Sequence, residues 1–151
     1  MHTLLESLEK RSPAAPALLG LCGKPASYQD LLQQVHRTAV WLAFKGIGRR
    51  DRVAIVMPDG PEMASLFLGV CSVTTCDPLN PAYKVNEFDF YLSDLEPRLV
   101  IVDSSIESAV RSAALARKIE VVELHSHASD QAGSFQLGPS TQGNGRFRFS
   151  E

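Results

Sequence analysis

The first candidate for chemistry is the alternating trio Glu123, His125 and His127 in the C-terminal third of the chain. On a β-strand, alternating residues point to one face, and carboxylate and imidazole groups are ligands of transition metals. A closed site needs a fourth ligand, and the sequence offers no evident one. We therefore favour a strand end that runs into a polar loop, with a metal site as the alternative.

The second candidate is the pair Cys71 and Cys76, which could bind a metal or take part in redox chemistry. Their spacing does not match a C-x-x-C motif. The third cysteine, Cys22, makes the number odd, and two of the three lie inside apolar stretches. We predict reduced, buried cysteines that act as small apolar residues of a cytoplasmic protein.

A third candidate is the segment GPSTQGNGRF at residues 138–147, which has the glycines and hydroxyl groups of a phosphate-binding loop. Such a loop surrounds phosphate oxygens with backbone N–H groups. No lysine follows this segment, and no apolar strand and helix frame it. The sequence therefore favours a linker over a phosphate site.

Two further sets of polar residues have a functional and a structural interpretation. A nucleotide or CoA phosphate could contact the basic cluster Arg49, Arg50 and Arg52, although such clusters are usually surface turns. Asn80 and Tyr83 could contact a substrate. We favour Asn80 as a residue that braces a turn through its own backbone.

Composition bounds the class of protein. The chain has 151 residues, of which 44% are hydrophobic and 21% charged, as expected for one globular domain. A net charge of −2 gives no attraction to nucleic acid or anionic lipid, so neither partner is expected. No window approaches the roughly 20 apolar residues of a membrane span, and residues 1–11 lack the features of a secretory signal. These features predict a cytoplasmic protein.

The elements that must position these residues follow from apolar periodicity. Short apolar runs predict strands at 53–57, 73–76, 99–102 and 119–124, with helices between them. Capping-box pairs predict the starts of the helices, at Ser27 with Asp30, Asp59 with Glu62, Asn86 with Asp89, and Ser104 with Glu107. The connections are long enough for helices to return the chain, so the strands should be parallel. We predict a three-layer α/β fold with a mainly parallel sheet of about four strands and helices on both faces.

Two stretches carry a resemblance to a known family: SYQDLLQQVHRTAVWLAFKGIGRRDRVAIVMPDGPEMASLFLGV at 27–70 and DPLNPAYKVNEFDFYLSDLEPRLVIVD at 77–103. Their Gly-Ile-Gly turn, Asp-Arg-Val-Ala strand, Pro-x-Gly-Pro-Glu helix start and Pro-Leu-Asn-Pro corner occur in the family's order. The chain thus resembles the opening of the adenylate-forming superfamily of acyl-CoA synthetases, luciferases and peptide-synthetase adenylation domains. The Ala-Tyr-Lys after the corner is most similar to the branch with oxalate–CoA ligases. Thr74 and Thr75 replace the Gly-Ala of many members.

The resemblance implies an ATP-, Mg- and CoA-dependent ligase of fatty acid or other carboxylate metabolism. It makes an acyl-adenylate and then an acyl-CoA. The family's phosphate loop, its Tyr-Gly-x-Thr-Glu segment, its ribose-binding Asp and its catalytic Lys are all absent from these 151 residues. No residue here therefore inherits a catalytic, cofactor-binding or metal-binding role. We expect residues 1–125 to be the N-terminal α/β portion of an AMP-binding synthetase domain, and 126–151 to be a linker or disordered tail.

A truncated unit of this kind should be inactive alone and should leave apolar surface exposed. We therefore expect it to self-associate or to bind a downstream synthetase segment. Two alternatives remain open: a stand-alone, non-catalytic interaction module, and one chain of a split synthetase.

Overall fold

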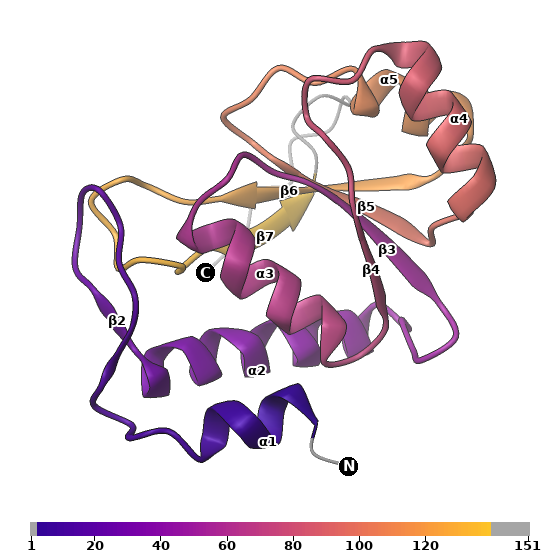
Figure 1. Cartoon of the computed structure of the whole chain (residues 1–151). Coiled ribbons are helices and arrows are strands. Elements are labelled where there is room, and N and C mark those ends of the chain that lie inside the picture. Colours follow the sequence, from indigo (N-terminus) through magenta and orange to yellow (C-terminus); the bar gives the residue numbers. More distant parts are fainter. Residues whose placement is uncertain (1–2, 140–151) are drawn as a thin grey trace, which may run out of the picture.

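The sheet at the centre of the molecule has five strands in the order β4-β3-β5-β6-β7 (Figure 1). The structure is a computed structural model and describes residues 3–139. The strands are β3 Arg52–Val56, β4 Thr75–Pro78, β5 Leu99–Asp103, β6 Glu120–His125 and β7 Gln136–Pro139. The first four pair in parallel, whereas β7 is antiparallel to β6. The predicted mainly parallel α/β sheet is confirmed, with one strand more than expected.

Helices cover both faces of this sheet, as predicted (Figure 1). One face packs against α2 and α3, and the other against α4 and α5. These helices are α2 Tyr28–Phe44, α3 Pro61–Cys71, α4 Val85–Leu95 and α5 Val110–Ala116. A short helix, α1 Leu4–Glu9, lies against α2, and a two-stranded sheet joins β1 Pro16–Leu18 to β2 Ala26–Ser27. None of the helices in the described part of the chain is long and apolar enough to cross a membrane.

The central strand β3 explains why the apolar runs in the sequence are continuous. Val53 and Ile55 point into the core beneath α2 and α3, whereas Ala54 and Val56 point into the core beneath α4 and α5. All four side chains are fully buried. A strand covered on both faces needs apolar residues at every position, and burial of each Val or Ile contributes about 1.5–3 kcal/mol.

The start of α2 is as predicted. Ser27 accepts a hydrogen bond from the Asp30 backbone N–H at 3.2 Å, and the Asp30 carboxylate accepts one from the Ser27 N–H at 2.9 Å. This reciprocal pair satisfies two of the N–H groups that the first turn of a helix leaves without partners.

The other three predicted helix starts are wrong. Helix α3 begins at Pro61 after Gly60, rather than at an Asp59 cap, because the fixed φ of proline suits the first helical position. Helix α4 begins after Lys84, whose N–H donates to Glu87, and Asn86 lies inside the helix. Helix α5 begins only after Ala109. The predicted cap at Ser104 is displaced by a turn at the end of β5.

The structure also differs from the prediction of a linker that begins at residue 126. Strand β7 extends the sheet, and Ala132 and Phe135 are buried in the loop before it. The Ala132 N–H donates to Lys24 O at 2.8 Å, and Gln34 Nε2 donates to Phe135 O at 3.4 Å. Hydrogen bonds between the backbone of this stretch and distant segments hold it in place, and such bonds need no periodicity in the sequence. Residues 140–151 lie outside the described part, as does most of the GPSTQGNGRF segment.

Candidate functional site

The topology of the sheet places a switch point between β3 and β5. From β3 the chain passes through α3 on one face to β4, whereas from β5 it passes through α5 on the other face to β6. In open parallel sheets, ligands bind outside the carboxyl ends of the strands at such a point. The segments that lie there are 57–60 after β3, and Asp103 at the end of β5 with residues 104–105 after it.

Asp103, the last residue of β5, is buried and held by its own turn. Its Oδ1 accepts hydrogen bonds from the Ser105 N–H at 2.7 Å and from the Ser105 hydroxyl at 2.6 Å. This turn explains why the helix does not begin at Ser104. The carboxylate shapes the β5–α5 loop.

Arg111 of α5 holds the same loop. Its guanidinium donates to Ile106 O at 2.8 Å, to Asp103 O at 3.0 Å and to the Glu123 carboxylate at 3.2 Å. The Glu123 side chain is 2% exposed and that of Arg111 is 11% exposed. A buried ion pair is tolerated only when further hydrogen bonds satisfy both groups. Because each guanidinium nitrogen already has a partner, Arg111 serves as a clamp between α5, the loop and β6 rather than as a ligand for phosphate.

The predicted trio on β6 does not assemble into a metal site. Glu123 and His125 do share a face, with His125 Nε2 4.0 Å from Glu123 Oε2. His127 lies beyond the strand end, and its N–H donates to the Asp130 carboxylate at 3.1 Å. Within residues 3–139, no three His, Cys, Asp or Glu side chains are grouped so that they could hold a metal. Strand β6 ends at His125, and the chain runs on into a loop, as the favoured interpretation predicts.

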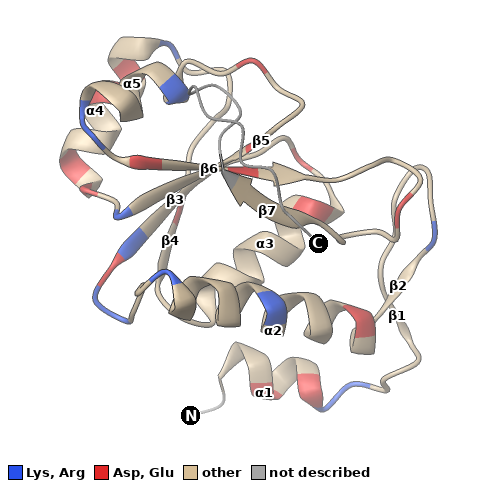
Figure 2. Cartoon of the chain, turned by 180° about the vertical axis from the view of Figure 1, so that it is seen from behind, with Lys and Arg blue, Asp and Glu red and all other residues tan. Residues whose placement is uncertain are grey.

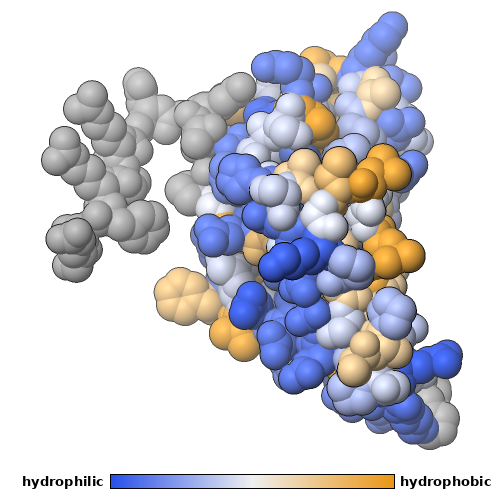
Figure 3. Space-filling view, turned by 90° about the vertical axis from the view of Figure 1, so that its left-hand side faces the viewer, coloured by the Kyte–Doolittle hydropathy of each residue, from blue (hydrophilic) through white to orange (hydrophobic). Residues whose placement is uncertain are grey.

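A surface cavity of about 750 Å³ lies beside the end of β3, between the loop at 19–22, the start of α3 and the loop at 127–132. Its polar lining includes Asp59, Glu62, Asp130 and His127. Figure 3 shows this side of the molecule, where hydrophobic side chains are scattered among hydrophilic ones. Three carboxylates repel phosphate groups at neutral pH. The cavity is therefore poorly suited to a nucleotide phosphate.

The basic cluster lies at the other end of the strands from this cavity. Arg49 and Arg50 precede β3 and Arg52 is its first residue, so they stand at the amino ends of the parallel strands (Figure 2). Arg50 and Arg52 are exposed, and Arg49 lines a cavity of about 540 Å³ next to α1. This position supports the interpretation as a surface turn.

Asn80 and Tyr83 both have structural partners. Asn80 Oδ1 accepts a hydrogen bond from the Ala82 N–H at 2.9 Å, which confirms that it braces the corner. The Tyr83 ring stacks on Tyr91 with centroids 5.2 Å apart and meets Phe88 edge-on at 5.7 Å. A hydrogen bond with Tyr91 raises the pKa of the Tyr83 hydroxyl.

The prediction that the cysteines are buried is wrong. Cys22 and Cys71 are exposed, and Cys76 is half-buried. Cys71 ends α3, where the apolar run of the sequence reaches the surface. Burial raises the pKa of the Cys76 thiol, and partial desolvation of the Cys71 sulfur also raises the pKa of that thiol, although Cys71 as a whole is exposed.

Comparison with known proteins places this fold among ligases. The family described as AMP-binding enzyme matches residues 5–143. A probable CoA ligase of Humulus lupulus is 35% identical over 116 residues, which are 76% of this chain and 22% of that protein. The oxalate–CoA ligase of Arabidopsis thaliana is 35% identical over 124 residues, which are 79% of this chain and 24% of that protein.

Among solved structures, MatB of Rhodopseudomonas palustris, determined both without ligand and with ATP bound, superposes with a TM-score of 0.71 at 27% identity. The match covers 87% of this chain and 26% of MatB. This chain thus spans about a quarter of the length of these three proteins.

Proposed function

Because this chain belongs to the AMP-binding enzyme family, we propose that it forms the N-terminal α/β segment of an ATP-dependent carboxylate–CoA ligase. In the full enzyme, a carboxylate attacks the α-phosphate of Mg-ATP to give an acyl-adenylate and pyrophosphate. The thiol of CoA then displaces AMP and leaves an acyl-CoA. The observation that carries the proposal is the match of residues 5–143 to the family, together with CoA ligases as relatives.

The role that we propose for this segment is that of a scaffold. Its central strands are buried on both faces, and rigid strands position catalytic loops more precisely than loops can position themselves. The charged groups near the switch point support a structural role, because Arg111 is bonded to three partners and the adjacent cavity is lined by carboxylates. Stabilisation of a phosphoryl-transfer transition state needs cations and free N–H donors. We therefore expect no adenylation by this segment alone.

Exposed apolar side chains on α2 support an association with further synthetase sequence. Phe44 is 89% exposed and Val40 is 68% exposed. A groove of about 310 Å³ lies between α2 and β7 and is lined by Trp41, Phe135 and Leu137. In the part of the chain that the structure describes, no strand pairs with the outer edge of β7. We propose that a downstream synthetase segment covers the groove between α2 and β7 and the outer edge of β7. This segment would belong to the same polypeptide or to the second chain of a split enzyme.

The first test is a segment exchange. Residues 5–139 of this chain would replace the matching segment of MatB, and ATP–pyrophosphate exchange and acyl-CoA formation would be measured with the carboxylate substrate of MatB. We expect both activities in the chimera and neither in MatB without its N-terminal segment. A chimera that is folded by circular dichroism but makes no adenylate would contradict the assignment.

The second test distinguishes a purely structural role of this segment from the presence of a nucleotide-binding site within it. Calorimetric titration of this chain alone with Mg-ATP should give no saturable heat. Saturable, stoichiometric binding would show that a nucleotide site lies within these residues and would contradict the scaffold role.

A further inference from the structure

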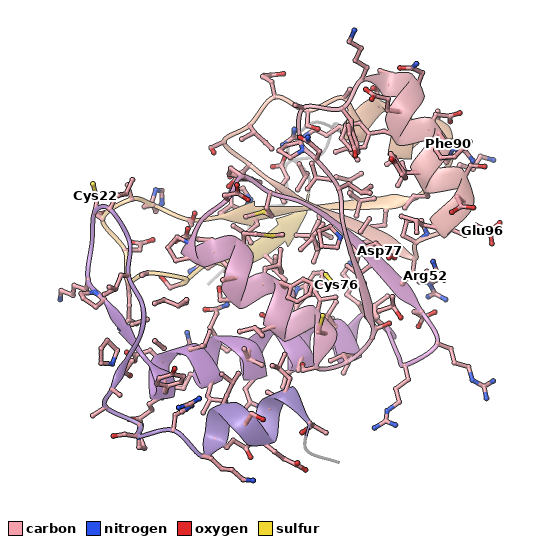
Figure 4. The ribbon with its side chains drawn as sticks, viewed as in Figure 1. Cys22, Arg52, Cys76, Asp77, Phe90 and Glu96 are labelled. Atoms are coloured by element: carbon pink, nitrogen blue, oxygen red, sulfur yellow. The ribbon has the colours of Figure 1, made fainter. Side chains whose placement is uncertain are left out.

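The groove between α2 and β7 lies at one edge of the sheet. Strand β7 is the edge strand opposite β4, whose Cys76 and Asp77 are labelled in Figure 4. The groove is lined by Trp41, Phe135 and Leu137. The side chains of Trp41 and Leu137 are only partly buried, and both pack against the core beneath α2 and α3. Because no strand among residues 3–139 pairs with the outer edge of β7, the groove is suited to a further extended segment.

The sequence that follows β7 has the pattern of such a segment. Beyond Pro139, the last residue of β7, the run Arg146-Phe147-Arg148-Phe149 lies outside the described part of the chain. Apolar and charged residues alternate in this run, as is typical of a strand with one buried and one exposed face. Gly143-Asn144-Gly145 stands immediately before the run and has the residues of a hairpin turn. This pattern predicts that the chain turns back at 143–145 and passes beside β7.

We propose that residues 146–149 bind the groove between α2 and β7 as an extended segment antiparallel to β7, with the ring of Phe149 as its anchor. These residues would be the first part of the cover that the proposed function, on which this inference rests, places over the groove. The occupant is thus a segment of this chain rather than a second copy of it or a separate partner.

The length of the turn decides which face the two phenylalanines take. A three-residue loop at 143–145 ends in glycine, which suits the left-handed backbone at the last position of such loops. This loop pairs Phe149 with Pro139. Leu137 shares the face of Pro139 because side chains alternate along a strand, and it becomes the diagonal neighbour of Phe149, within reach of an aromatic ring. Phe147 has the same face as Phe149, so both rings point toward α2.

Charge favours the same orientation. Arg37 of α2 lines the groove, so a segment that turned Arg146 and Arg148 toward α2 would bring like charges together. With the rings toward α2, both arginines point to the other face. Pro139 has no N–H to donate to the returning segment, so burial of the rings, rather than a complete ladder of hydrogen bonds, would hold the segment in place.

The fluorescence of Trp41 tests the proposal, because Trp41 is the only tryptophan of the chain and lines the groove. The emission maximum and acrylamide quenching would be measured for the full chain and for three of its variants. We expect Phe149→Ser to shift the emission to longer wavelength and to increase quenching, and Phe147→Ser to do so less. Phe90→Ser is the matched control and should change neither quantity, because Phe90 is 66% exposed on α4, which covers the other face of the sheet (Figure 4).

A peptide with the sequence of residues 140–151 gives a second measurement. It would be added to the full chain that carries both Phe147→Ser and Phe149→Ser. The peptide should return the Trp41 emission to shorter wavelength in a saturable way, whereas the same peptide with Phe149→Ser should not. Failure of the first peptide to do so would count against the proposal.

Two results with the full chain would overturn the proposal. The first is equal Trp41 emission and quenching in the unsubstituted chain and in Phe149→Ser. The second is a protection of Trp41 that disappears on dilution, because a second copy of the chain would then cover the groove. Neither readout involves ligase activity. An unprotected Trp41 together with an active MatB chimera would therefore refute this inference alone, whereas a protected Trp41 with an inactive chimera would contradict the proposed function alone.

Discussion

Two polar clusters of the molecule differ in how far apart their members lie in the chain. At the start of α2, Ser27 and Asp30 are three residues apart and exchange hydrogen bonds in a partly buried position. At the carboxyl ends of the strands, Arg111 and Glu123 are 12 residues apart and almost fully buried. The local cluster sets where a helix begins, whereas the distant one joins a helix, a loop and a strand. We expect the second to carry more of the stability.

The largest expected effect is the removal of the clamp. Arg111→Met keeps most of the side-chain volume but removes the guanidinium that pairs with the buried Glu123 carboxylate. Loss of one member of a buried ion pair typically costs about 3–5 kcal/mol. We expect a decrease of that size in the free energy of unfolding, measured by urea denaturation at neutral pH.

The matched control for the clamp is Arg117→Met. Arg117 pairs with Asp89 at 2.8 Å, but both side chains are substantially exposed. Exposed pairs contribute about 0–1 kcal/mol, so this variant should remain close to the unsubstituted protein. Equal losses in the two variants would contradict the claim that burial makes the Arg111 clamp strong.

The second expected effect tests the local cluster. Ser27→Ala removes the side chain that accepts the Asp30 N–H, and the loss of such a cap costs about 1 kcal/mol. Thr3→Ala is the comparison, because Thr3 makes the same capping box on the exposed, six-residue helix α1. Urea denaturation should show a smaller change for Thr3→Ala. A change larger than that of Ser27→Ala would mean that α1 contributes more to global stability than its exposure indicates.

The same contrast explains which features the sequence could predict. The fold followed from β3, because Val53 and Ile55 serve one face while Ala54 and Val56 serve the other, so the apolar run is continuous. The cap at Ser27 followed from a three-residue spacing.

The sequence could not predict features that depend on distant partners. A metal site with Glu123 remained an alternative because nothing in the sequence indicates that Arg111 lies beside it. Phe135 looked like part of a linker because its burial depends on α2, about a hundred residues earlier. A competing local signal explains the incorrect cap at Asp59, because helix α3 begins at Pro61 instead.

A third and smaller effect concerns a buried polar group that, within residues 3–139, has a hydrogen-bond partner neither nearby in the chain nor far from it. Asp77 lies on the edge strand β4, and its Oδ2 is buried without a hydrogen-bond partner among the described residues. A buried acceptor without a partner is destabilising. Asp77→Val should therefore raise the free energy of unfolding by about 0.5 kcal/mol, because it removes the buried Oδ2 that has no partner.

The control for this gain is Thr75→Val at an exposed position of the same strand. It reports the strand preference of valine by itself. A gain in Thr75→Val equal to that in Asp77→Val would assign the whole effect to β-propensity. A loss in Asp77→Val would show that the carboxylate makes a favourable interaction.

The smallest expected effect is a pH dependence of the free energy of unfolding, which isolates the contribution of the Asp30 carboxylate from that of Ser27. Hydrogen bonds from the Ser27 backbone and side chain lower the pKa of Asp30 below its ordinary value of 3.8. A carboxyl whose pKa is lower in the folded state stabilises the protein above the unfolded pKa, and this contribution is lost as pH falls through the folded pKa. Asp30→Asn should therefore be less stable than the unsubstituted chain at neutral pH, and the difference should shrink below about pH 4. Urea midpoints across this range would measure the convergence, and a difference that is independent of pH would mean that the amide loses geometry rather than charge.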